Sequence, residues 1–327
     1  MKLLSIILLL SLQRAKTATG PFCYHDPTCD PHSWPVQYPS CNGTHQSPID
    51  VLTDQAQCGD HLGTFNFTGY SNPQFLLSIK HTKQTVRVTT NTQMKVGGGG
   101  LPMDYLTSQF HLHWGNQTTG RGSEHRLNGH QANMELHIVN RQDGLNLTQV
   151  FSQPDGLAVL GFLIEVETNI TENAAWKNFT SLIQHLREDG DVLSLNGTFS
   201  MMDLISGVNL TKYYRYNGSL TTPECDEVVL WTIFEEPIRL NASLVETFFT
   251  DLYVNSSQGI HLLNTFREPQ RNTNQVYASQ GACRAAPNPT PTPTPTAGSP
   301  LRNWAHPLCL LLPLAWLWVG VLEPILY

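Results

Sequence analysis

Three histidines occur at spacings that suit a metal site built on two neighbouring strands. His111 and His113 flank Leu112, and His137 follows 24 residues after His113 in a second alternating segment. In a β-strand, side chains two residues apart point to the same face, so one strand presents both His111 and His113 on one side. His137 on an adjacent strand would complete a set of three nitrogens. Three protein nitrogens with the fourth position open are typical of a catalytic zinc site.

Hydrogen-bond acceptors stand two residues before two of these histidines. Gln109 precedes His111 and Glu135 precedes His137, each on the same strand face as its histidine. A metal-bound imidazole needs its other ring nitrogen held by an acceptor of this kind. The alternatives are a core histidine bonded to a backbone carbonyl, and a structural zinc site, which would need a fourth protein ligand. The cysteines are spread out rather than paired, so the pattern favours catalytic zinc.

A sheet is needed to position these side chains. Strands are predicted where β-branched or aromatic runs are bounded by turn residues. These runs cover residues 75–79, 85–90, 110–114, 133–139, 158–166 and 227–234. Helical periodicity is convincing only at residues 174–186 and 244–253. The hydrophobic fraction of 40% suffices for one large domain, and a net charge of −7 without a basic cluster argues against nucleic-acid binding.

Residues 1–20 are predicted to be a secretory signal peptide. Met1 and Lys2 precede an apolar run, and Ala18 and Gly20 are small residues suited to cleavage. A buried helix is the alternative. Residues 21–285 then form the catalytic domain, and the Pro/Thr-rich segment 286–298 forms an extended stalk that cannot build a core.

Residues 299–327 are predicted to be a glycosylphosphatidylinositol (GPI) anchor signal that is removed on maturation. The apolar stretch 307–322 is short for a spanning helix, which needs about 20 residues. Small residues suited to lipid attachment, Ala297, Gly298 and Ser299, precede a polar spacer. A single-pass transmembrane helix is the alternative.

In a secreted protein the cysteines can form disulfides and the sequons can be glycosylated. Without Cys309, which lies in the removed tail, six cysteines remain, and six allow 15 disulfide connectivities. The sequons, whose density suits a surface glycoprotein, begin at Asn42, Asn66, Asn116, Asn146, Asn169, Asn178, Asn196, Asn209, Asn217, Asn241 and Asn255.

Five motifs, in order, resemble those of the α-class carbonic anhydrases. They are Gln46-Ser47-Pro48-Ile49-Asp50, Phe110-His111-Leu112-His113-Trp114-Gly115, Ser123-Glu124-His125, Glu135-Leu136-His137-Ile138-Val139 and Gly218-Ser219-Leu220-Thr221-Thr222-Pro223. The chain is most similar to the membrane-anchored forms, types IV and XV, in its Cys23-Tyr24 start, its Gly-rich run before Leu101 and its Cys225. The resemblance covers roughly residues 21–285 and implies a β-dominated mixed α/β fold, with a large, mostly antiparallel twisted sheet of about ten strands and short surface helices.

The resemblance also implies a mechanism. Zinc held by His111, His113 and His137 would carry a hydroxide that attacks CO2. Carbonic anhydrase is the standard example of a metal that lowers the pKa of its bound water to near 7. Thr221 would accept a hydrogen bond from this hydroxide and donate its own to Glu124, which directs the hydroxide lone pair. Taken alone, the Thr-Thr-Pro segment would be an ordinary turn. The positions that would form the CO2 pocket are Val139, Val159, Leu220, Thr222, Val229 and Trp231.

Other residues acquire expected roles from the same resemblance. His125 is expected to be a structural hydrogen-bonding residue, because its sequence neighbour Glu124 faces the site. The proton-shuttle position falls on Gln84, whose amide does not titrate near neutral pH, and His81 nearby should face away unless the strand bends. The implied disulfides are Cys23–Cys29 and Cys41–Cys225, which leaves Cys58 with Cys283.

The resulting prediction is a zinc lyase that interconverts CO2 with bicarbonate and a proton at the outer cell surface. Bicarbonate transporters are candidate partners, and the membrane contact would be the lipid anchor. One rival is a non-enzymatic binding module, which would have lost zinc ligands, whereas all three histidines remain. The other rival, a zinc esterase or peptidase, would show His-Glu-x-x-His on a helix, and that motif is absent from the sequence.

Overall fold

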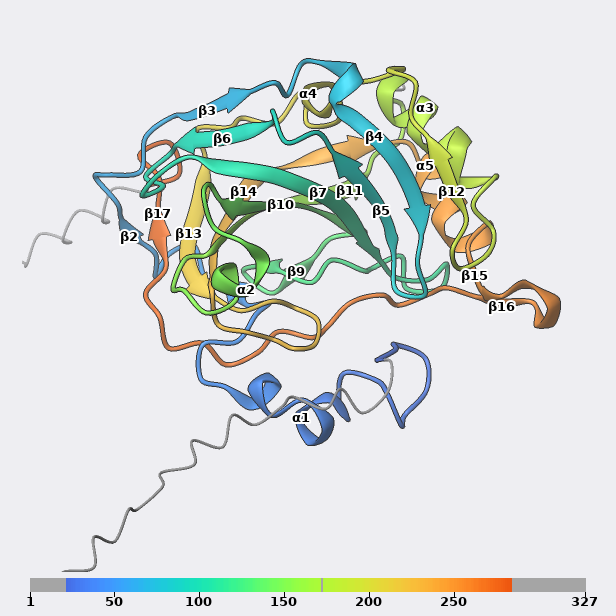
Figure 1. The fold of residues 1–327 in the computed structure, drawn as a ribbon, viewed down its shortest axis with the longest axis horizontal. Coiled ribbons are helices and arrows are strands. Elements are labelled where there is room, and N and C mark those ends of the chain that lie inside the picture. Colours follow the sequence, from blue (N-terminus) through green and yellow to red (C-terminus); the bar gives the residue numbers. More distant parts are fainter. Residues whose placement is uncertain (1–21, 172, 284–327) are drawn as a thin grey trace, which may run out of the picture. The chain divides into compact units, whose positions relative to one another are not determined.

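The computed structural model describes residues 22–171 and 173–283, and its centre is a twelve-stranded sheet. The signal peptide, stalk and anchor signal expected from the sequence, with Ala297, Gly298 and Ser299, lie outside these residues. The strands follow the order β12, β4, β5, β7, β10, β11, β14, β13, β17, β2, and β3 pairs with β6 beside β7. Figure 1 shows β5, β7, β10 and β11 running side by side through the middle of the molecule.

Five of the six predicted strands are longer than their sequence runs, because hydrogen-bonded pairing continues past the β-branched segments, whereas β5 is one residue shorter than its run and β13 was not predicted. The central strands are β4 (Leu76–His81), β5 (Val86–Thr90), β7 (Tyr105–Trp114), β10 (Met134–Gln142), β11 (Leu157–Val166), β13 (Tyr213–Gly218) and β14 (Val229–Leu240). The outer strands are β2 (Gln57–Cys58), β3 (Phe65–Thr68), β6 (Lys95–Gly98), β12 (Val192–Ser194) and β17 (Tyr277–Ala278). Smaller sheets contain β1 (Asp50–Val51), β8 (Arg126–Leu127) and β9 (His130–Gln131), and β15 (Tyr253–Asn255) with β16 (Ile260–His261).

The large sheet is mixed but mostly antiparallel, which agrees with the expectation, as does the β-rich class. Strand β11 pairs with β14 in parallel, and β17 pairs with β2 in parallel; the other neighbours in the large sheet are antiparallel. Parallel neighbours need a long crossover rather than a hairpin. Residues 167–228, which contain α3, α4 and β13, provide that crossover between β11 and β14.

Helices are short and lie outside the sheet. They are α1 (Trp34–Gln37), α2 (Leu147–Val150), α3 (Ala174–Ile183), α4 (Met201–Leu204) and α5 (Ala242–Thr250), with 3₁₀ turns η1 (Pro39–Asn42), η2 (Pro73–Phe75) and η3 (Ser256–Gln258). The two predicted helices are present but end earlier than expected, at Ile183 and Thr250. Asn241 caps α5, because its side-chain oxygen accepts the Ser243 N–H. Among the described residues, no helix has the length and apolar character needed to cross a membrane.

The main hydrophobic core lies on the sheet face opposite the three histidines. Leu112, between the two histidines of β7, is fully buried there together with Leu136 and Ile138 of β10. Aromatic contacts join this face to the helices: the Phe110 ring lies 5.8 Å from that of Phe179, a residue of α3. Strand alternation therefore buries one set of side chains in the core and leaves the histidine set on the other face.

Three disulfides join the segments around the sheet. They are Cys23–Cys29, Cys41–Cys225 and Cys58–Cys283, the pairing that the resemblance implied. Cys41–Cys225 lies just after the Thr221-Thr222-Pro223 segment and ties it to the N-terminal part of the chain.

Candidate metal centre and active site

The sheet register brings the three histidines together. His111 on β7 is directly opposite His137 on β10, and His113 is opposite Glu135. The ligand atoms of His111, His113 and His137 all lie within 4.8 Å of one another. Directly opposed residues share a sheet face, so this cluster follows from the strand period once β7 and β10 pair in this register.

Each histidine has one ring nitrogen engaged and the other free. His111 Nδ1 is 2.9 Å from Gln109 Oε1, and His137 Nε2 is 2.7 Å from Glu135 Oε1, as the spacing predicted. His113 Nδ1 is 2.6 Å from the backbone oxygen of Thr265. Since these oxygens accept hydrogen bonds, the engaged nitrogens carry the protons. The nitrogens left for a metal are Nε2 of His111, Nε2 of His113 and Nδ1 of His137.

The donor set fits zinc. His113 Nε2 is buried and has no hydrogen-bond partner among the described residues, which is costly unless an ion satisfies it. Burial, assisted by the other two histidines, holds the pKa of His111 well below its usual range, and burial lowers the pKa of His113 to about 3. Burial also lowers the pKa of His137. The imidazoles are therefore neutral at physiological pH, the form that binds metals.

Glu135 accepts the hydrogen bonds that orient the residues around the metal centre. Its Oε1 lies 2.7 Å from both His137 Nε2 and His125 Nδ1, and its Oε2 accepts the backbone N–H groups of Glu124 and His125 at 2.9 and 2.8 Å. Burial raises the pKa of Glu135, but the electrostatic interactions and hydrogen bonds with His125 and His137 outweigh it and hold that pKa well below its usual range. Gly161, opposite His137, leaves room for this carboxylate, because a Cβ there would meet Glu135 Oε1 at 3.0 Å.

A second group of residues lies close enough to bind a metal, namely His125, Glu135 and His137, but hydrogen bonds already occupy their ligand atoms. His125 Nδ1 and His137 Nε2 both bond to Glu135, and His125 Nε2 lies 2.7 Å from the Tyr216 hydroxyl. This arrangement fits a hydrogen-bond network that orients His137 rather than a second ion site. It agrees with the structural role expected for His125.

Glu124 lies behind the metal centre, next to Thr221. Its Oε1 accepts the backbone N–H of Arg267 at 2.9 Å, and its Oε2 lies 3.3 Å from His113 Nε2 and 3.9 Å from His137 Nδ1. Burial raises the pKa of Glu124 well above its usual range, while a hydrogen bond with the Thr221 side chain and the Arg267 N–H act in the opposite direction. A cation held by the histidines would stabilise the charged form of this carboxylate.

An apolar cavity of about 230 Å³ opens beside the histidines. Of the positions expected to form the CO2 pocket, five line this cavity: Val139, Val159, Leu220, Thr222 and Trp231. Val229 does not line it. Val229 is buried in the hydrophobic cluster that also contains the cavity residues Val159 and Trp231. Phe151, which the sequence reasoning did not single out, lines the cavity and is 43% exposed.

A second, more polar cavity of about 270 Å³ adjoins the first. Gln84 lines it and donates its amide hydrogen to the Phe22 backbone oxygen at 3.2 Å. His81, by contrast, is fully buried in β4 and lines neither cavity, so the strand does not bend to bring it into the site. Phe22 and Tyr24 form part of the wall, a contribution that their sequence positions far from the histidines did not reveal.

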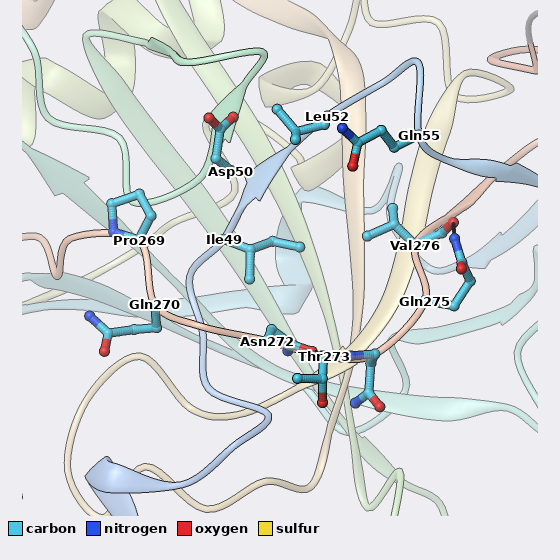
Figure 2. A pocket seen from close by; sticks show the side chains of 11 residues that line it. Ile49, Asp50, Leu52, Gln55, Pro269, Gln270, Asn272, Thr273, Gln275 and Val276 are labelled. Atoms are coloured by element: carbon cyan, nitrogen blue, oxygen red, sulfur yellow. Dashed lines mark hydrogen bonds between the residues drawn. The ribbon is translucent and has the colours of Figure 1, made fainter. Parts of the chain in front are cut away.

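A larger hollow lies elsewhere, between the segment around β1 and residues 269–276 (Figure 2). Figure 2 shows Ile49 and Val276 facing each other across it, with amide side chains around the rim. Asp50 is the only carboxylate among its lining residues and accepts the Gly129 N–H at 2.9 Å. No histidine or cysteine lines it, so the histidine centre remains the site with catalytic chemistry.

A large β-sheet carrying a three-histidine centre on one face defines a class of zinc enzyme. The chain belongs to the eukaryotic-type carbonic anhydrases, whose family model matches residues 29–280. It is 36% identical to carbonic anhydrase 4 of Oryctolagus cuniculus over 256 residues, 76% of this chain and 80% of the relative. It is 34% identical to carbonic anhydrase 15 of Mus musculus, over 80% of this chain and 84% of the relative. It is 33% identical to carbonic anhydrase 12 of Homo sapiens, over 82% of this chain and 76% of the relative.

Membership of this family confirms the predicted activity. The protein is a lyase that uses zinc to interconvert CO2 with bicarbonate and a proton. The rival predictions of a binding module and of a helical zinc peptidase are not supported, because the three histidines remain together and lie on strands.

Proposed function

We propose that His111 Nε2, His113 Nε2 and His137 Nδ1 hold the zinc ion of this carbonic anhydrase. The observation that carries this assignment is that each histidine has its other nitrogen committed to an acceptor, so that one nitrogen of each is left for a metal in a cluster whose ligand atoms lie within 4.8 Å of one another. Zinc bound there supplies a Lewis acid that makes hydroxide available near neutral pH, an effect for which carbonic anhydrase is the standard example.

Thr221 and Glu124 are proposed to orient the attacking oxygen. A threonine hydroxyl has one proton to donate, and Glu124 as a carboxylate can only accept it. Thr221 then offers only a lone pair to the attacking group, which must turn its own proton toward Thr221 and its electron pair toward the substrate. The burial of both side chains and the effect of Thr221 on the pKa of Glu124 support this role.

The apolar cavity is proposed to hold CO2. Val139, Val159, Leu220 and Trp231 present hydrocarbon surface without competing hydrogen-bond groups, apart from the indole N–H of Trp231, which donates to the Ser219 oxygen at 2.9 Å. An uncharged linear molecule is favoured in such a cavity over water, which would lose hydrogen bonds on entering. The substrate carbon would then lie next to the histidine centre that both cavities share.

Proton release is proposed to limit the rate. Gln84 occupies the wall where a titrating shuttle would stand, and its amide cannot accept and release a proton near neutral pH. His81 lies outside the cavity. Protons would therefore leave through water or through buffer molecules that enter the polar cavity.

The mature protein is proposed to be GPI-anchored at the outer cell surface, with residues 21–285 as catalytic domain. Three disulfides are consistent with an oxidising compartment. Several sequon asparagines are exposed and support glycosylation: Asn42, Asn66, Asn146, Asn169, Asn178, Asn196 and Asn217. Bicarbonate transporters in the same membrane are the proposed partners, because they move the product of this reaction.

The zinc assignment is tested by metal analysis combined with a CO2 hydration assay. Wild-type protein should carry one zinc per chain, and His113→Ala should lose both metal and activity. His130→Ala is the control, because His130 is an exposed histidine paired with Glu165. Full activity in metal-free His113→Ala protein would overturn the assignment.

The anchor is tested on intact cells with phosphatidylinositol-specific phospholipase C. Release of active enzyme is expected, because no polypeptide would cross the membrane. Resistance to the phospholipase, together with detection of residues 308–322 in the mature protein, would favour a transmembrane helix instead.

A further inference from the structure

The two cavities beside the histidines differ in chemistry and meet at three residues. Gln109, His111 and Thr222 line both cavities. The apolar cavity extends from them toward Val159 and Trp231, whereas the polar cavity extends toward β5 and the N-terminal segment. The neutral substrate and its anionic product therefore have chemically distinct surroundings on either side of the same centre.

Arg87 is the charged side chain of the polar cavity. It lies on β5 between the buried Val86 and Val88, and its register partner on β7 is His111. Opposed residues share a sheet face, so the Arg87 side chain emerges on the same face as the histidines, where it lines the cavity and is exposed. After burial and the two neighbouring histidines, the positive charge of Arg87 also lowers the pKa of His111.

No carboxylate balances this charge within the cavity. The residues lining the polar cavity include no aspartate or glutamate. Within residues 22–171 and 173–283, Arg87 has no recorded ion pair or side-chain hydrogen bond, in contrast to surface cations such as Lys95 with Asp143 at 2.7 Å and Lys212 with Glu236 at 3.0 Å. Arg141, the cation of the apolar cavity, donates its Nη1 to the Leu145 oxygen at 2.9 Å. Arg87 is therefore a cation of the polar cavity whose donors are available.

The chemistry of Arg87 matches bicarbonate and not CO2. Bicarbonate is a planar oxyanion, and the planar guanidinium group offers paired N–H donors in a matching geometry. CO2 is uncharged and would gain little from this group. A fixed cation beside the centre thus distinguishes the two carbon species by charge.

We propose that Arg87 forms an oxyanion-binding subsite in the polar cavity that holds bicarbonate next to the His111 side of the zinc centre. The subsite lowers the KM for bicarbonate without changing that for CO2. It rests on the proposed zinc site.

The test is calorimetric titration of the full zinc-loaded protein with bicarbonate at constant ionic strength, for wild type, Arg87→Gln and Arg87→Lys. Binding to Arg87→Gln should weaken about three- to tenfold, the range for one charge-assisted contact discounted for solvent exposure. Arg87→Lys should recover part of the loss, because it keeps the charge and loses the paired donors. Steady-state assays should show a raised KM for bicarbonate with an unchanged KM for CO2. Because the equilibrium constant of the reaction is fixed, kcat for bicarbonate dehydration should rise in the same proportion as its KM.

Arg271→Gln is the matched control, because Arg271 is exposed, lies outside both cavities and changes the net charge by the same amount. Unchanged bicarbonate affinity in Arg87→Gln, or an equal loss in Arg271→Gln, would overturn the subsite. Zinc content is measured for every variant, so affinities are compared per zinc-loaded chain. Failure of the zinc centre itself would appear separately, as absence of zinc from the wild type.

Discussion

Glu135 Oε1 and His137 Nε2 lie 2.7 Å apart on neighbouring same-face positions of β10, and both side chains are buried. The carboxylate fixes which nitrogen of His137 carries the proton and leaves Nδ1 for the metal. The same carboxylate binds His125 and two backbone N–H groups, so its position is set by four partners. The orientation of a zinc ligand is thus secured by a residue two positions away in the sequence.

Glu135→Gln should weaken zinc binding. The amide keeps the shape of the side chain but removes the charge, so the hydrogen bond to His137 loses strength and the amide NH2 group opposes one of the N–H donors. We expect zinc affinity to fall about 10- to 100-fold, measured by competition with a chelating dye. Glu165→Gln, which changes a partly buried carboxylate beside His130 and away from the metal centre, should leave affinity unchanged. Wild-type affinity in a folded Glu135→Gln protein would contradict the role of the carboxylate.

Thr221→Val should reduce catalysis while keeping the metal. Valine preserves the volume of threonine but can neither accept a hydrogen bond from the attacking group nor donate one to Glu124. We expect kcat/KM for CO2 hydration to fall about a hundredfold with normal zinc content. Thr273→Val, in the separate hollow of Figure 2, is the control and should be neutral. Equal activity of the two variants would remove Thr221 from the mechanism.

Gln84→His should raise the hydration rate at low buffer concentration. A histidine at this cavity position titrates near neutral pH and can carry the proton that Gln84 cannot. Added imidazole-type buffer should raise the maximal rate of the wild type more than that of the variant. Stopped-flow measurements over a range of buffer concentrations test both effects. Rates that respond to neither change would show that another group already carries the proton.

Loss of the Cys41–Cys225 disulfide should destabilise the fold more than loss of Cys23–Cys29. The bonded cysteines are 184 residues apart in the first pair and 6 apart in the second. The chain-entropy model gives about 5 kcal/mol for the longer loop and about 2 kcal/mol for the shorter one. Paired Cys→Ser variants compared by denaturant unfolding measure the difference. Equal free energies of unfolding for the two double variants would indicate that loop length does not govern this stability.

Local sequence spacing was sufficient to find the core of the metal site. Gln109, His111 and His113 lie two apart on one strand, as Glu135 and His137 do on the next, and the strand period alone places each set on one face. The β-branched and aromatic runs likewise predicted a strand-rich chain, and the resemblance to the carbonic anhydrases implied the large sheet. Because this information lies in residues that are close together in the sequence, it can be obtained without the tertiary structure.

Only the tertiary structure decided how the site is completed. The Thr265 carbonyl that holds His113 is 152 residues away in sequence, and a backbone oxygen carries no residue-type signal. The same applies to Phe22 and Tyr24 in the cavity wall and to Arg87, whose place opposite His111 depends on how β5 pairs with β7. The parallel pairing of β11 with β14 depends in turn on the path of residues 167–228. These contacts join distant segments through chain path and strand register, which no local period in the sequence specifies.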